Sequence, residues 1–391
     1  MSSQFRMVTD INVDVVNTNT LNATSANIVN AEILNLNIDN IDLPVGGEIK
    51  IGNVHVLSTP VNGSSIALGN TAPSNQGTNA IAIGVSAGQT SQSANSIAIG
   101  LNAGSASQSG SAIAIGTNCG QVSQGTSAIA IGSGAGQNTQ GQNCIAIGSG
   151  TGNTGQLTSA VAIGNLSGQT NQGTLAVAIG QNSGNSSQGT NSVAIGSTAG
   201  QTSQRSSSVA IGSGSGQIDQ GTTCVAIGRI AGQTTQGQNS VAIGNQAGQL
   251  NQGINSVAIG NQAGRSSQGA NCVAIGANAG GLNQDQESIA IGATCCQNGM
   301  GAQNVFIGFG SATAGTATGT GNVCIGSGTN ISTGVNGSII LGAGASSTAT
   351  GQLVLGSTTS PLTLSATSGP QNGYIEITIN SLPYKIPIYN P

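Results

Sequence analysis

Aromatic and charged side chains are scarce in this chain. Of its 391 residues six are aromatic and none is Trp, and no aromatic residue lies between Arg6 and Val305. Most of the chain therefore lacks the side chains of a conventional bulky core. Charged residues make up 4%, against roughly 25% in an ordinary soluble domain. Six basic residues and a net charge of −4 give no footprint for DNA or RNA, and one histidine with ten scattered carboxylates leaves little for an active site. We expect neither an enzyme nor a nucleic-acid-binding protein.

The sequence also shows no pattern typical of a targeting signal or a membrane-spanning segment. The start, MSSQFRMVTD, has no apolar h-region, so we expect no secretory signal. No run approaches the roughly 18 apolar residues of a membrane-spanning helix, so we expect no membrane insertion. Val and Ile are plentiful, which argues against a disordered chain.

What the chain does have is a strict repeat. A tetrad of the form Ile/Val-Ala-Ile-Gly recurs every 16 residues, with Phe306 in place of Ala in the last regular copy. Its closing glycines are Gly84, Gly100, Gly116, Gly132, Gly148, Gly164, Gly180, Gly196, Gly212, Gly228, Gly244, Gly260, Gly276, Gly292 and Gly308. Looser copies end at Gly69, Gly326, Gly342 and Gly356. Degraded terminal units are typical of a stacked array that must be capped.

Each tetrad reads as a short β-strand, because it is β-branched, alternating and too brief for a helix. Val241 and Ile243 lie on one face of their copy, and Ser240 and Ala242 on the other. We expect the large residues to face the inside of the coil and the small ones to lie where another backbone comes close. A second glycine follows four residues after the first in almost every unit, which suits sharp corners between short strands.

A glutamine stands eight residues past nearly every tetrad glycine. Stacked coils place equivalent side chains about 4.7–4.9 Å apart, where amides can donate to one neighbour and accept from the other, whereas stacked charges would repel. This ladder of amides predicts an all-β parallel β-solenoid of 16-residue coils. Its members are Gln92, Gln108, Gln124, Gln140, Gln156, Gln172, Gln188, Gln204, Gln220, Gln236, Gln252, Gln268 and Gln284.

One coil this thin buries little apolar surface relative to the entropy of ordering it. We therefore expect a homotrimer in which the small Ala/Ser face of each chain is buried against its sister chains.

The repeat resembles that of a known family. Asn239-Ser240-Val241-Ala242-Ile243-Gly244 and the copy at 255–260 look like the NSVAIG-type repeats of YadA-like trimeric adhesin heads. The resemblance covers about residues 64–310. It implies a left-handed parallel β-roll with three chains packed around one axis.

The two ends of the chain differ from the array. Residues 374–379 and 384–389 alternate on either side of Asn380-Ser381-Leu382-Pro383 and predict a β-hairpin that would close the end of the roll. This ending resembles the closing segment of fibre-like structural proteins of large DNA viruses and some phages. We divide the chain into an N-terminal β stalk with a small hairpin around Gly52-Asn53 (1–60), the regular roll (61–310), degenerate repeats (311–356) and a hairpin cap (357–391).

Candidates for chemistry are few, and we expect no cofactor and no metal. Cys144, Cys224 and Cys272 share one position of the repeat but lie several coils apart, beyond the ~7 Å Cα limit of a disulfide; we interpret the cysteines as small buried fillers. His55 has no catalytic partners nearby in the sequence. Asp285 and Glu287 are the only close carboxylates of the array. Three tyrosines are possible contacts for sugars at a tip, or cover the end of the roll: Tyr374, Tyr384 and Tyr389.

These features favour a structural and attachment protein, a trimeric fibre or spike at a virion surface. Its partners would be itself, a capsid or other virion protein at one end, and a host glycan or receptor. The main alternative is a trimeric adhesin at a cell surface. An ice-binding solenoid needs an unbroken Thr ladder, and a carbohydrate-active solenoid needs paired carboxylates on neighbouring coils, so both fit the sequence less well.

Overall fold

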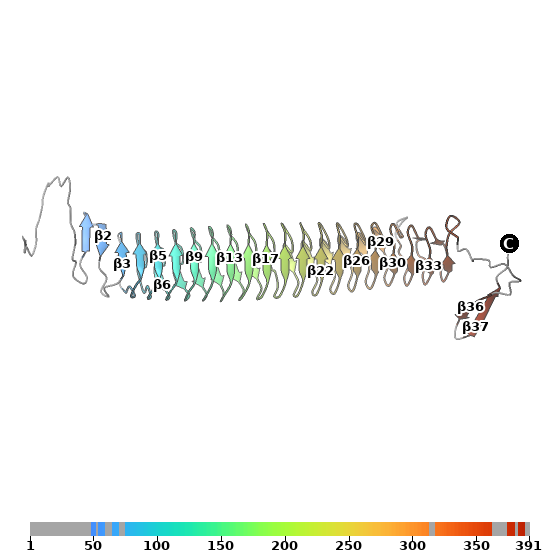
Figure 1. The fold of residues 1–391 in the computed structure, drawn as a ribbon, viewed down its shortest axis with the longest axis horizontal. Coiled ribbons are helices and arrows are strands. Elements are labelled where there is room, and N and C mark those ends of the chain that lie inside the picture. Colours follow the sequence, from blue (N-terminus) through green and yellow to red (C-terminus); the bar gives the residue numbers. More distant parts are fainter. Residues whose placement is uncertain are drawn as a thin grey trace, which may run out of the picture. The chain divides into compact units, whose positions relative to one another are not determined.

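The computed structural model describes residues 48–51, 54–58, 65–69, 75–312, 317–361, 374–379 and 382–387. Every regular element in these residues is a β-strand. Most of the predicted N-terminal stalk lies outside the described residues. The predicted all-β parallel solenoid is confirmed, and its coils stack one behind another along a straight array (Figure 1).

One wall of the solenoid is built by the tetrads. Each tetrad contributes a three-residue strand, and each strand pairs in parallel with its equivalents in the neighbouring coils, so that Val177 lies between Val161 and Val193. Nineteen such strands, together with β1 and β2, make a 21-stranded sheet. They are β3 (Ile66–Leu68), β4 (Ile81–Ile83), β5 (Ile97–Ile99), β7 (Ile113–Ile115), β9 (Ile129–Ile131), β11 (Ile145–Ile147), β13 (Val161–Ile163), β15 (Val177–Ile179), β17 (Val193–Ile195), β18 (Val209–Ile211), β20 (Val225–Ile227), β22 (Val241–Ile243), β24 (Val257–Ile259), β26 (Val273–Ile275), β28 (Ile289–Ile291), β30 (Val305–Ile307), β31 (Val323–Ile325), β33 (Ile339–Leu341) and β35 (Leu353–Leu355).

The opposite wall is built by strands that end on the ladder glutamines. They form two six-stranded parallel sheets, separated at a coil where Thr202 makes only isolated bridges to Ser186 and Ile218, and a two-stranded sheet follows in the degenerate coils. The strands are β6 (Ala106–Gln108), β8 (Val122–Gln124), β10 (Asn138–Gln140), β12 (Thr154–Gln156), β14 (Thr170–Gln172), β16 (Ser186–Gln188), β19 (Ile218–Gln220), β21 (Thr234–Gln236), β23 (Leu250–Gln252), β25 (Ser266–Gln268), β27 (Leu282–Gln284), β29 (Asn298–Met300), β32 (Asn330–Ile331) and β34 (Ser346–Ser347).

Two hairpins flank the solenoid in the sequence. β1 (Glu48–Ile51) and β2 (Val54–Ser58) pair antiparallel around Gly52-Asn53, as predicted, and β2 joins the main sheet through Ser58 opposite Ala67 of β3. This places an antiparallel strand on the first edge of the parallel wall. β36 (Tyr374–Ile379) and β37 (Leu382–Pro387) form the predicted C-terminal hairpin, with the second strand beginning at Leu382 rather than at Tyr384.

Positions within a coil are counted here from the tetrad glycine, position 0. The corners use left-handed backbone at three non-glycine positions, +2, +7 and +11, as at Ser86, Ser91 and Asn95 with φ of 55°, 53° and 60°. Ser and Asn dominate these positions because short polar side chains tolerate this conformation better than most. Sequence reasoning placed corners at the glycines alone.

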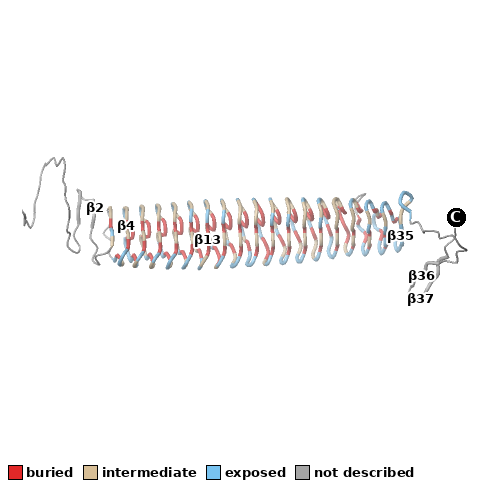
Figure 2. Tube along the Cα trace, viewed as in Figure 1, coloured by how far each residue is buried: buried red, intermediate tan, exposed pale blue. Residues whose placement is uncertain are grey.

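The prediction that the large tetrad residues face the inside of the coil is wrong. The middle residue of each three-residue strand is buried, with Ala162, Ala178 and Ala242 all 0% exposed, whereas Val161 and Ile163 on either side of Ala162 point outward. Figure 2 shows the buried residues recurring in every coil. The expected burial of the Ala/Ser face against sister chains is therefore also wrong, because that face is already enclosed by its own coil.

The physical reason is the width of the interior. The ladder glutamine enters the same space from the opposite wall, and thirteen of these side chains from Gln92 to Gln284 are buried. A Cβ placed on Gly168 would lie 2.7 Å from Oε1 of Gln172 and 3.1 Å from Cβ of Ala162. The space that faces the glutamine thus holds a methyl group and no larger aliphatic side chain.

Candidate interaction surface

The interior is held together by a continuous ladder of amides. From Gln108 to Gln284, Nε2 of each glutamine donates a hydrogen bond to Oε1 of the glutamine one coil further along, at 3.0–3.2 Å. The same nitrogen also donates to backbone of its own coil; for Gln172 the acceptor is the carbonyl of Val161 at 2.8 Å. A large buried polar group is stabilised only when it is paired in this way. The amides all point in one direction along the solenoid.

The glycine at position +4 exists to make room for this ladder. At Gly88, Gly104 and Gly168 an added Cβ would come within 2.4–2.8 Å of the amide of the glutamine at +8 in the same coil. The glycine at position 0 has a different constraint: at Gly100 the Cβ would lie 2.5 Å from the carbonyl oxygen of Gly116 in the next coil. The two recurring glycines therefore avoid two different clashes, one with the glutamine side chain of the same coil and one with the backbone of the next coil.

The interior changes its chemistry at one coil near the end of the array. There Cys296 replaces the glycine at +4, and Met300 replaces the glutamine at +8, both buried. Beyond this point larger apolar side chains enter the core, with Phe306, Ile331 and Ile340 in one buried cluster, beside the buried amides of Asn304 and Asn322. The two replacements occur in the same coil, so the side chain at +4 meets a flexible thioether in place of an amide.

Two further amide ladders run along the exterior, and sequence reasoning missed both. At position +5, Gln217, Gln233 and Gln249 are linked by hydrogen bonds of 2.9–3.0 Å. At position +11, Asn239 donates to Asn255 at 3.1 Å and Asn255 donates to Asn271 at 3.2 Å. The signal that could have revealed them is the recurrence of Gln or Asn at 16-residue intervals, the same signal that identified the inner ladder.

The most prominent exterior feature is an aliphatic stripe, defined as the first and third residues of the nineteen parallel strands β3 to β35. Each of these residues is Ile, Val or Leu, and none of them is buried. Ile147 and Ile243, for example, are 37% and 36% exposed. The stripe is bordered at position +11 by polar residues such as Asn239 and Asn255. An apolar centre with a polar rim is the usual anatomy of a protein–protein interface, and an apolar surface this extended is unusual for a free monomer.

The two close carboxylates of the array, Asp285 and Glu287, lie in different surroundings. Glu287 lies at the +11 corner, where its Oε2 accepts a hydrogen bond from Gln303 at 3.0 Å, so it continues the line of exterior amides. Asp285 is exposed beside an open hollow lined also by Asn251, Ser267 and Gln286. In the part of the chain that the structure describes, no group of three or more His, Cys, Asp or Glu could hold a metal ion.

All seven cysteines are buried free thiols, which agrees with the interpretation as small fillers. Cys224 Sγ donates to the carbonyl of Gly237 at 2.8 Å, and Ser240 Oγ makes the same bond to Gly253 at 2.6 Å one coil later. Cys and Ser are thus equivalent at this position. Burial raises the pKa of Cys119 and Cys295 to about 12, so these thiols stay protonated and unreactive at neutral pH.

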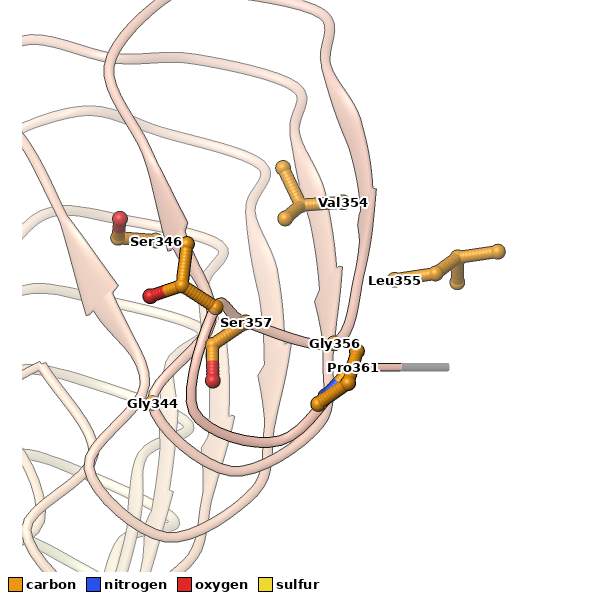
Figure 3. A pocket seen from close by; sticks show the side chains of 8 residues that line it. Gly344, Ser346, Val354, Leu355, Gly356, Ser357 and Pro361 are labelled. Atoms are coloured by element: carbon orange, nitrogen blue, oxygen red, sulfur yellow. The ribbon is translucent and has the colours of Figure 1, made fainter. Parts of the chain in front are cut away.

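The C-terminal end of the solenoid carries a hollow of about 570 Å³. Figure 3 shows Leu355 directed away from the coil and Val354 directed toward its interior. The lining otherwise consists of Gly and small hydroxyl residues with Pro361, and it contains no ionisable side chain. Tyr374 lies in β36 and Tyr384 in β37; His55 lies in β2, opposite Lys50. Tyr389 lies outside the described residues.

Comparison with known proteins adds no relative. A scan against models of protein families finds no match, and a search of the curated proteins finds none either. Among the described residues, no helix is long and apolar enough to cross a membrane.

Proposed function

We propose that this chain assembles with itself through the aliphatic stripe into a homotrimeric fibre, and that the fibre is a structural and attachment element of a virus particle. The observation that carries the proposal is the stripe, which leaves Ile, Val and Leu side chains unburied in every coil. Burial of such surface is the main driving force of association.

The size of the stripe is sufficient for a stable assembly. At about 4.8 Å per strand, nineteen strands extend over roughly 85–90 Å, and two outward side chains per strand give a width of roughly 10 Å. The resulting area is roughly 900 Å² per chain, and a trimer shares it between two neighbours. Each pairwise contact then buries roughly 900 Å² in total, below the standard ~1,600 Å², and the three contacts together bury roughly 2,700 Å².

Symmetry favours copies of this chain as the partner. The stripe presents nearly the same pair of aliphatic residues at every level, so parallel copies can meet like residues with like around a common axis, and every copy is equivalent. The number three follows the resemblance of the repeats to YadA-like heads. The inner face, which holds Ala and Gln, plays no part in association.

A role on a virus particle is supported by the C-terminal hairpin, whose sequence is similar to the closing segment of viral fibre-like proteins. The long, weakly charged solenoid suits a spacer that presents shallow sites in three copies, so that attachment to a host glycan or receptor depends on avidity. A trimeric adhesin at a cell surface is the alternative, favoured by the similarity of the repeats to adhesin heads.

The test has two stages. Native mass spectrometry of the purified chain should give three times the 37.7 kDa chain mass, and electron micrographs should show a slim rod; a chain that stays monomeric at all concentrations would overturn the proposal. Antibodies to the protein should then label intact virions, whereas labelling confined to a cell envelope would favour the alternative.

A further inference from the structure

One exterior position beside the stripe behaves differently at the ends of the array than in its middle. Position +1 follows the tetrad glycine, in the turn that directly continues each strand of the stripe, and its side chain is exposed or half-buried in every regular coil. In the middle coils this position is polar. The residues there are Thr117, Ser133, Ser149, Asn165, Gln181, Ser197, Ser213, Arg229, Asn245 and Asn261.

At both ends of the array the same position is apolar. Val85 and Leu101 occupy it in the first two regular coils and are 48% and 47% exposed. Ala277, Ala293 and Phe309 occupy it in the last three. The apolar surface is therefore wider at the two ends than between them.

Phe309 is the extreme member of this set. It is 67% exposed, and it is the one aromatic side chain on the exterior among the residues whose burial the structure describes. Its backbone is fixed between coils, since its carbonyl accepts a hydrogen bond from the N–H of Gly328 at 2.8 Å. An aromatic ring held on a rigid backbone and left in water has the character of an interface anchor.

We infer that Phe309 packs against a second copy of this chain and, with Val85 and Leu101 at the other end, fastens the assembly at its two ends. This inference rests on the proposed self-association. In the middle coils the polar residues at position +1 keep the apolar contact narrow, and at the level of Arg229 guanidinium groups of symmetry-related chains would repel if that position were enclosed.

The experiment places the photo-cross-linking residue p-benzoyl-phenylalanine at position 309 of the full chain. Leu157 provides the matched control, because it is also large, apolar and 51% exposed but stands at position +9, directly after strand β12 of the opposite wall. Irradiation of the assembled protein should give covalent dimers and trimers on a denaturing gel from position 309, and monomers alone from position 157.

A second pair of variants measures the energetic role. Phe309→Ser should raise the concentration at which half of the chains are assembled by about tenfold or more, as expected for loss of a buried aromatic anchor in each copy, whereas Leu157→Ser should leave it unchanged. Circular dichroism checks that both variants keep their strands. If the wild type assembles but position 309 neither cross-links nor changes assembly, this inference fails while the proposed function stands. A monomeric wild type would instead overturn the proposed function itself.

Discussion

A single side chain type, glutamine, accounts for much of the interior of this protein. Its length lets Nε2 of Gln172 reach the carbonyl of Val161 at 2.8 Å within its own coil and Oε1 of Gln188 in the next at 3.1 Å. Leucine would fill similar volume but would leave Oε1 of Gln188 without this donor, which costs roughly 1–3 kcal/mol for a buried group. The residue thus supplies both filling and cohesion in a space too narrow for a two-sided aliphatic core.

The buried thiols make stability depend on pH in the alkaline range. The pKa of Cys119 is raised from 9.0 to about 12 by desolvation, so between these values the unfolded chain ionises this thiol and the folded chain does not. The stability that this thiol confers is complete below pH 9 and is lost as the pH rises toward 12.

A comparison of wild type with Cys119→Ala tests this effect. Ala stands at the equivalent position +3 in neighbouring coils, as Ala103 and Ala135, so the substitution should fit. Between pH 9 and 11 the wild type should lose about 2 kcal/mol more unfolding free energy than the variant, measured by urea denaturation at each pH. Equal losses in the two proteins would show that this thiol ionises as easily folded as unfolded.

Within one coil, the glycine at +4 and the glutamine at +8 act as a pair. The chain itself carries the alternative pair, Cys296 with Met300, in which a residue other than glycine adopts φ of 45°. The steric conflict at Gly168, where an added Cβ would lie 2.7 Å from Oε1 of Gln172, is therefore conditional on the amide.

A double-mutant cycle measures this coupling. Gly168→Ala should destabilise the protein strongly, through the clash and the left-handed backbone at φ of 51°. Gln172→Met should destabilise it by breaking the ladder. The double variant should be more stable than the sum of the two single effects by about 1 kcal/mol or more, as judged from denaturation midpoints; strict additivity would mean that the glycine serves only its backbone conformation.

The period, the strands and the stacking amides could be predicted from the sequence, because a side chain repeated every 16 residues must meet its own copies when coils stack. Which face of the tetrad points inward could not be predicted from alternation alone. Size favoured the pair Val241 and Ile243, but the interior already contains Gln252 and has room only for Ala242 and Ser240. Because the glutamine side chain points into the interior, the strand opposite it must direct its small residues inward.

The aliphatic stripe on the exterior has the same physical origin, the narrow interior of the coil. The sequence identified all the aliphatic residues of the tetrads but placed them inside the coil. They are excluded from the interior and therefore form the unburied stripe, which was not predicted. The sequence pattern predicted self-association through the small Ala/Ser face, which is instead enclosed within its own coil; self-association itself stays a prediction.

At the scale of the whole molecule, one charge on the stripe should prevent assembly. Ile179→Asp places a carboxylate where the side chain is 36% exposed in one chain and would be buried unpaired in the trimer, which is strongly unfavourable. Sedimentation velocity should show monomers for this variant.

The matched control is Asn171→Asp, which adds the same charge to the same coil at an exposed position on the opposite wall. It should assemble as the wild type does. Loss of assembly in both variants would point to a general effect of charge, and retention in both would remove the stripe from the interface.

The uniform ladder also makes length an adjustable property. Since Gln156, Gln172 and Gln188 are joined by equivalent bonds, excision of 16 consecutive residues between them lets the remaining partners meet again with the same geometry and shortens the array by about 4.8 Å. Recombination between such units can lengthen or trim the solenoid in fixed steps without redesign of its core, so its length can evolve independently of the sequences at its two ends.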